Sequence, residues 1–258
     1  MSNQVSVFIM DVSNSSEEHI GNEVSEYLAQ LKNSMTKWTQ NRVATRISHR
    51  AGDELVVVCK GYATAYVLAF YISRIWKFTD HLPYFGLSFG DIQADVNTLN
   101  LETWIHPLMK QARQANDYLK NQSNRSLFRF ALPRSQREQG YTAYSEQFEA
   151  LINTDLTLKQ EHMNEQTDIQ SLVCSLYLIL GQQNKVSQYL GRTTATISHH
   201  IKQGKTQVIL QAFDDMVKVL GSLGAPDEAF LADKLQSNIR RHINHHLGDY
   251  FPVERSSS

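Results

Sequence analysis

VATRISHRAGDELVVVCKG, residues 43–61, is the stretch that decides the fold of the amino-terminal half of the chain. Its first residues, 43–50, alternate between apolar and polar side chains, whereas residues 55–58 are apolar without interruption. Gly52 and Asp53 stand between these two runs, and both are residue types that tight turns favour. The stretch therefore predicts a β-hairpin with Asp53 at its tip.

The segments on either side of the hairpin predict an α/β domain over residues 1–135. Upstream, residues 5–11 are typical of a buried strand, and residues 17–38 repeat apolar side chains every three or four positions, as an amphipathic helix does. Because hairpin pairing is mixed with crossover connections, we expect one sheet with helices on one face. The downstream elements that we expect are a helix at 62–78, a strand at 84–92, a helix at 106–120 and a strand at 126–132.

The second half of the chain has a different character. From about Pro133 the sequence becomes polar and rich in turn-forming residues, and no clear strand pattern follows. We interpret residues 136–165 as a linker and residues 166–258 as an all-α region for DNA binding and dimerisation.

Residues 183–201 carry the clearest functional pattern. Val186 and Leu190 lie four positions apart, Gly191 follows them where a tight turn needs a positive φ angle, and Ile197 and Ile201 again lie four positions apart. This spacing predicts a helix-turn-helix, whose second helix would enter the major groove of double-stranded DNA. The residues that we predict to contact DNA are Lys185, Arg192, Thr193, Thr194, Thr196, Ser198, His199, His200, Lys202 and Lys205.

Local charge favours the same interpretation, although the whole chain has a formal net charge of only -1. Residues 169–213 contain four lysines or arginines and no aspartate or glutamate, and neutralisation of phosphates supplies much of the affinity for DNA. Ser187 and Arg192 depart from the alanine and the aliphatic residue that the usual motif prefers. The alternative is that the two helices serve packing alone.

Proteins that read DNA in this way are commonly two-fold dimers, so we expect a homodimer. An apolar stripe near the carboxyl terminus could pair two subunits, or it could pack on its own chain. Its members repeat every four residues and are Leu231, Leu235, Ile239, Ile243 and Leu247.

Asp11 and Asp53 form the candidate metal site. Asp11 ends the first predicted strand, Asp53 caps the hairpin, and a sheet that pairs these strands would make them neighbours. Carboxylates are the ligands that Mg²⁺ prefers, so Mg²⁺ is the cofactor that this pair could hold. The alternative is that backbone amides satisfy both acids.

Four motifs in order resemble the SatD family of bacterial proteins, and through it the class III nucleotidyl cyclase and GGDEF fold. They are FIMDVSNSSEE at 8–18, RAGDEL at 50–55, FGLSFGDI at 85–92 and HPLMKQARQANDYLK at 106–120, followed by the helix-turn-helix. The resemblance implies a nucleotidyl cyclase-like, ferredoxin-type α/β sandwich joined to an all-α DNA-binding domain, with a regulatory role.

The same resemblance implies roles for individual residues. Asp11 and Asp53 match the metal-binding acids of true cyclases, and Arg113 matches the arginine that stabilises their transition state, which makes Arg113 a candidate ligand-binding residue. Met109 stands where cyclases place an asparagine, and it cannot form the strong hydrogen bond that such catalysis uses. The chain therefore resembles a domain that senses a nucleotide or dimerises more than an active enzyme.

These observations lead to one principal hypothesis and two competitors. We expect a transcriptional regulator, because the helix-turn-helix is the clearest functional pattern. We expect it to be cytoplasmic, because no run reaches the ~18 apolar residues of a membrane helix. Neither Cys59 nor Cys174 has the spacing of a metal ligand. The competitors are a Mg²⁺-dependent enzyme acting on nucleotides, with the helical half docking a partner, and an interaction scaffold with neither activity.

Overall fold

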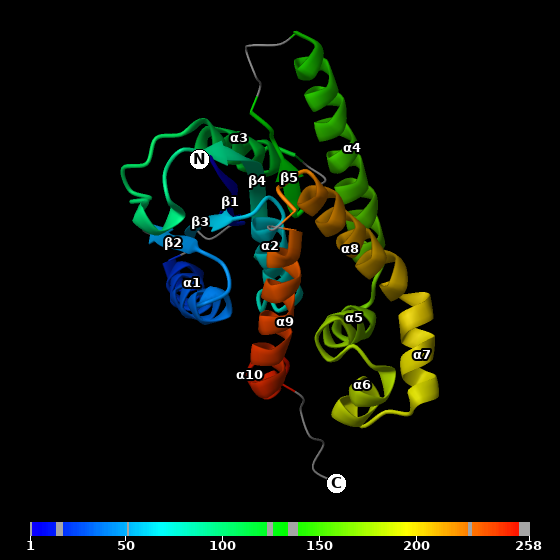
Figure 1. Cartoon of the computed structure of the whole chain (residues 1–258). Coiled ribbons are helices and arrows are strands. Elements are labelled where there is room, and N and C mark those ends of the chain that lie inside the picture. The colour runs from blue at the N-terminus through cyan, green and yellow to red at the C-terminus, as the bar shows by residue number, and fades with distance from the viewer. Residues whose placement is uncertain are drawn as a thin grey trace.

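A five-stranded sheet with strand order β2-β3-β1-β4-β5 lies at the centre of the amino-terminal half (Figure 1). The structure is a computed structural model that describes residues 2–13, 18–50, 52–122, 126–133, 139–226 and 229–252. Residues 1, 14–17, 51, 123–125, 134–138, 227–228 and 253–258 of the predicted segments lie outside the described part. The strands are β1 (Asn3–Val12), β2 (Thr45–Arg50), β3 (Glu54–Lys60), β4 (Pro83–Ile92) and β5 (Phe128–Phe130). The predicted hairpin is present as the antiparallel pair β2 and β3.

Helices cover both faces of this sheet, so the prediction of helices on one face is wrong. Helices α1 (Glu18–Thr39) and α2 (Thr64–Arg74) lie on the face that carries Phe8 and Met10 of β1. Helix α3 (Pro107–Lys120) lies on the opposite face, which carries Val7 and Ile9. The apolar run in β1 is continuous because a central strand that is buried on both faces needs apolar side chains in both directions.

Helix α3 approaches β4 closely at Gly86. A Cβ atom there would lie 2.1 Å from the backbone oxygen of Ala112 and 2.4 Å from the backbone nitrogen of Asn116, so only glycine fits. The fully buried Asn116 side chain donates to the carbonyls of Ile9 at 3.1 Å and Tyr84 at 2.8 Å. These contacts fix α3 against β1 and β4.

Helix α2 joins the two halves of the chain. Ten of its eleven residues are buried, because the sheet lies on one side of the helix and carboxy-terminal helices lie on the other. Phe70 of α2 stacks on Phe213 with 4.0 Å between the ring centroids. Arg74 of α2 donates to the backbone oxygen of Ser171 at 2.8 Å. One continuous apolar core therefore spans both of the predicted domains, 1–135 and 166–258.

Residues 139–164, most of the predicted linker, form helix α4 (Gln139–Asn164). Its Asn153 accepts from the backbone nitrogen of Phe130 at 2.8 Å and donates to the oxygen of the same residue at 2.9 Å, so it pairs with strand β5 as a further strand would. The segment is therefore a packed helix and not a loose connection.

Among the described residues six helices follow α4, and Figure 1 shows them below and to the right of the sheet. The stripe on α9 packs against its own chain, since Leu235, Ile239 and Ile243 are each 0% exposed. None of the helices in the described part is long and apolar enough to cross a membrane. The six are α5 (Asp168–Leu180), α6 (Gln183–Leu190), α7 (Thr194–Gln203), α8 (Thr206–Ser222), α9 (Ala229–His245) and α10 (Leu247–Tyr250).

Candidate functional site

Helices α6 and α7 form a compact pair held on α5. Val186, Ile197 and Ile201 are buried between the three helices, as their spacing predicts. Gly191 ends α6 with φ of +61°, a conformation that costs other residues energy. Thr193 caps α7, because its hydroxyl oxygen accepts from the backbone nitrogen of Thr196 at 3.1 Å. The local sequence therefore accounts for the geometry of this pair.

Ser187, one of the two departures from the usual motif, has a structural role. Its hydroxyl donates to the backbone oxygen of Arg192 at 2.8 Å, and the nitrogen of Arg192 donates to the oxygen of Ser187 at 3.0 Å. The two bonds close the turn after Gly191. An alanine at position 187 would leave the first of these bonds unmade.

The outward side of α7 is exposed and carries polar side chains. The exposed residues on this side are Thr194, Ser198, His199 and Lys202. Thr196 and His200 are half-buried. Lys185 of α6 and Arg192 of the turn are also exposed. The predicted DNA contacts thus divide into an exposed set and a half-buried pair.

Lys205 differs from the other predicted cationic contacts, because its charge is already paired. Its ammonium donates to Glu165 Oε2 at 2.6 Å and lies 3.2 Å from Nδ1 of His162, both at the end of α4. The carboxylate that neutralises it lies just before the acid-free stretch 169–213, so the charge count over that stretch does not include it. The free cations of this surface are Lys185, Arg192 and Lys202 among the described residues, since none of the three has an ion pair.

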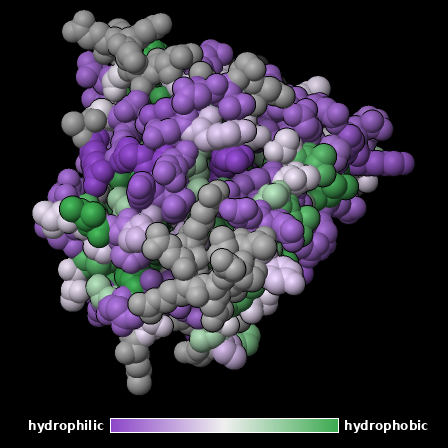
Figure 2. Space-filling view, turned by 90° about the horizontal axis from the view of Figure 1, so that it is seen from above, coloured by the Kyte–Doolittle hydropathy of each residue, from purple (hydrophilic) through white to green (hydrophobic). Residues whose placement is uncertain are grey.

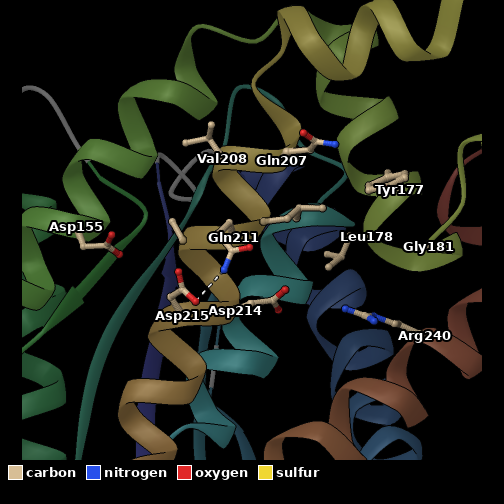
Figure 3. A pocket seen from close by; sticks show the side chains of 12 residues that line it. Asp155, Tyr177, Leu178, Gly181, Gln207, Val208, Gln211, Asp214, Asp215 and Arg240 are labelled. Atoms are coloured by element: carbon tan, nitrogen blue, oxygen red, sulfur yellow. Dashed lines mark hydrogen bonds between the residues drawn. The ribbon is translucent and has the colours of Figure 1, made fainter. Parts of the chain in front are cut away.

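A cavity of about 850 Å³ opens between α4, α5, α8 and α9 (Figure 3). Asp155 lies on one side of it, Tyr177 and Arg240 on the other, and Asp214 and Asp215 of α8 between them. Burial raises the pKa of both Asp155 and Asp214 above the ordinary range. Three carboxylates repel phosphates, so this cavity does not suit the nucleotide ligand that the resemblance implies.

Asp11 and Asp53 are neighbours, as their predicted positions require. Asp53 lies close enough to Asp11 for its charge to raise the pKa of Asp11, and the ammonium of Lys120 donates to Asp11 Oδ2. Burial raises the pKa of Asp11, the Lys120 hydrogen bond lowers it, and the charge of Asp53 raises it again. A divalent ion at this pair would have to displace or repel Lys120, a cation supplied by the same chain.

Arg113, the candidate ligand-binding residue, is engaged by Glu54. Its two terminal nitrogens donate to the two oxygens of Glu54 at 2.7 Å and 2.9 Å. Burial alone would raise the pKa of Glu54, but the hydrogen bonds and charge of Arg113, with the charge of Arg50, lower it. A phosphate could reach Arg113 only by competing with this bidentate pair.

Glu54 and Lys120 both belong to this cluster of charged residues; the sequence placed Glu54 near Asp53 without a role and did not single out Lys120. Glu54 stands beside Asp53, and Lys120 lies one turn beyond Asn116 on α3, so only the crossing of α3 over β1 reveals either role.

The chain matches no protein-family model, no curated protein and no solved structure. Its function is therefore inferred from its own residues.

Proposed function

We propose that this protein is a regulator that binds double-stranded DNA through α6 and α7, a helix-turn-helix in which α7 enters the major groove. The observation that carries the proposal is the exposed side of α7, with Thr194, Ser198, His199 and Lys202 on a helix that Ile197 and Ile201 anchor from behind. A short helix with one buried edge and one exposed polar side is the geometry that groove readers use.

Some of the exposed residues would supply affinity for DNA, and others would supply sequence specificity. Lys185, Arg192 and Lys202 would contact phosphates, which position a protein on the duplex without reading its sequence. Ser198 and His199, which are both exposed on α7, would contact base edges. Lys205 is not assigned to DNA, because Glu165 already neutralises it.

The test is duplex binding by the intact chain as a function of salt, measured by fluorescence anisotropy. Replacing Lys185, Arg192 and Lys202 together with alanine should lower affinity for every sequence and reduce the slope of log K against log [salt] by about 1 per residue. Lys110→Ala, an exposed cation on α3, is the matched control and should change neither quantity.

Two further outcomes decide the proposal. Ser198→Ala with His199→Ala should change sequence preference and leave the salt slope alone, because neither side chain is a fixed cation. Equal affinity and equal slope for the triple variant and the intact protein would show that α6 and α7 do not bind DNA.

The enzyme alternative has one observation in its favour, the proximity of Asp11 and Asp53. Against it, Lys120 and Arg113 already neutralise Asp11 and Glu54. We therefore assign the cyclase-like half a supporting role in a SatD-like regulator. Turnover of ATP or GTP with Mg²⁺ or Mn²⁺ that disappears in Asp53→Ala would favour the enzyme instead.

A further inference from the structure

Six large apolar side chains gather on the outer sides of α4 and α8. On α4, Tyr144, Leu151 and Leu158 are 74%, 67% and 61% exposed. Figure 2 shows hydrophobic patches on both the left and the right of the view, and the right is the side on which α4 and α8 lie in Figure 1. We call this set the α4–α8 band; its other members, 53%, 43% and 47% exposed, are Val208, Val219 and Leu223.

The members on α4 are spaced by seven residues. Two turns of an α-helix take about 7 residues, so Tyr144, Leu151 and Leu158 form a straight stripe about 21 Å long. The inward side of the same helix is occupied by Ile152 and Leu156, which are buried against the core. The stripe is therefore additional to what the fold needs, and a seven-residue repeat is typical of helices that pack along their length on another helix.

Leu151 lies at the middle of α4, which spans Gln139–Asn164. In an antiparallel pair of α4 helices with Leu151 on the two-fold axis, Leu151 meets Leu151 of the second copy and Tyr144 meets Leu158. Every large apolar member on α4 then has an apolar partner.

We propose that the α4–α8 band is the homodimer interface and that α4 pairs with α4 of a second copy in antiparallel register about Leu151. The band exposes on the order of 600 Å² of apolar side chain, comparable with the ~800 Å² per partner of a stable interface. The proposal rests on the proposed function in one respect: two-fold DNA readers need a second copy to place two recognition helices on one site.

The other apolar stripe that the sequence offered for dimerisation is already used within the chain. Leu235, Ile239 and Ile243 of α9 are fully buried against α1, α2 and α5. The remaining exposed large apolar residues among those described are scattered singly on other elements. They are Leu82, Ile105, Tyr118, Ile169 and Phe230.

Sedimentation of the intact protein at micromolar concentration, without DNA, tests the dimer. The intact protein should sediment as a dimer, and Leu151→Glu with Leu158→Glu should sediment as a monomer. Both side chains are more than half exposed, so the double variant should keep its melting temperature, which separates lost pairing from unfolding. Ile105→Glu, at a position that is 98% exposed away from the band, is the control and should remain dimeric.

Disulfide crosslinking tests the register. Cys59 and Cys174 are 0% exposed and should not react, so a single introduced cysteine reports its own neighbour. The cysteine of Leu151→Cys should form a disulfide with the same cysteine of the second copy on mild oxidation. Tyr144→Cys and Leu158→Cys should crosslink when the two proteins are mixed and not when either is alone.

Each outcome bears on one proposal. A monomeric intact protein, or a dimer that survives both glutamates, would overturn the interface. Self-crosslinking of Tyr144→Cys would overturn the antiparallel register. A dimer that responds as expected but binds no duplex DNA would support the interface and overturn the proposed function.

Discussion

Lys159 is a single charged residue that is buried in the core of this protein. Its side chain is 2% exposed, and its ammonium donates to the hydroxyl of Tyr66 and lies 4.9 Å from the centre of that ring. Phe70 contributes a second ring at 5.4 Å. Burial lowers the pKa of Lys159 to about 8, although the charge of Asp155 opposes the shift.

Lys159→Met should stabilise the protein at pH 7. Between pH 8 and pH ~10 the unfolded chain keeps its Lys159 proton longer than the folded chain does, so the stability of the intact protein rises with pH there. Below that range a charge is buried, and its removal should add about 1–3 kcal/mol. Urea melts from pH 7 to 9.5 should show the variant to be more stable and without this rise.

Lys218→Met is the control for this experiment, because its side chain is 73% exposed on α8. It should leave both the stability and its pH dependence unchanged. A destabilised Lys159→Met with the pH dependence of the intact protein would mean that the aromatic rings and Asp155 offset the burial of the charge in full.

Lys120→Ala should strengthen metal binding at Asp11 and Asp53. The charge of Asp53 raises the pKa of Asp11, and Lys120 supplies the positive charge that offsets the repulsion between the two carboxylates. Without it, a divalent ion is the remaining source of compensation, and Mn²⁺ affinity by calorimetry should rise about tenfold or more, as a gain of ~1.4 kcal/mol requires.

Lys110→Ala, on the same helix and exposed, should bind Mn²⁺ no better than the intact protein. Equal Mn²⁺ affinity in Lys120→Ala and the intact protein would remove the metal interpretation of Asp11 and Asp53.

At the scale of the element, the crossing of α3 over β4 depends on the missing side chain of Gly86. Gly86→Ala should destabilise the protein by ~3 kcal/mol, because backbone atoms of Ala112 and Asn116 fill the position of a Cβ atom and α3 would have to move. Guanidinium denaturation measures the loss.

Ser88→Ala is the matched control on the same strand and the same face. Ser88 is fully buried, and its hydroxyl has no hydrogen-bond partner among the described residues, so alanine there should cost nothing or stabilise slightly. Similar losses for Gly86→Ala and Ser88→Ala would contradict the close approach of α3 to β4.

At the scale of the whole molecule, the two predicted domains should not separate. A chain of residues 1–165 would lose α5, α8 and α9 and expose the side of α2 that they cover. We expect it to lack a cooperative thermal transition and near-ultraviolet circular dichroism, and to bind a hydrophobic dye. A cooperative transition in this fragment would show that the amino-terminal half is an independent domain. For the same reason, point variants in the intact chain are the sound test of DNA binding.

The elements of the fold were largely predictable from the sequence. The hairpin at 43–61, the alternation of strands and helices in the first half and the pair of short helices around Gly191 all follow from local periodicity and turn residues. Helix α4 was mistaken for a linker because its inward side carries Asn153 and Lys159, which pair with a strand and a tyrosine, in place of a continuous apolar stripe.

The sequence by itself determined which segments become strands and helices and which short helix presents hydroxyls and cations, because periodicity and turn chemistry act over a few residues. Only the tertiary structure decided which charged side chains form ion pairs. Lys120 meets Asp11 across 109 residues, Arg113 meets Glu54 across 59, and Lys205 meets Glu165 across 40. Such pairs depend on where distant elements cross, and that crossing is set by the packing of α3 on β1 and of α4 beside α8, which no local pattern contains.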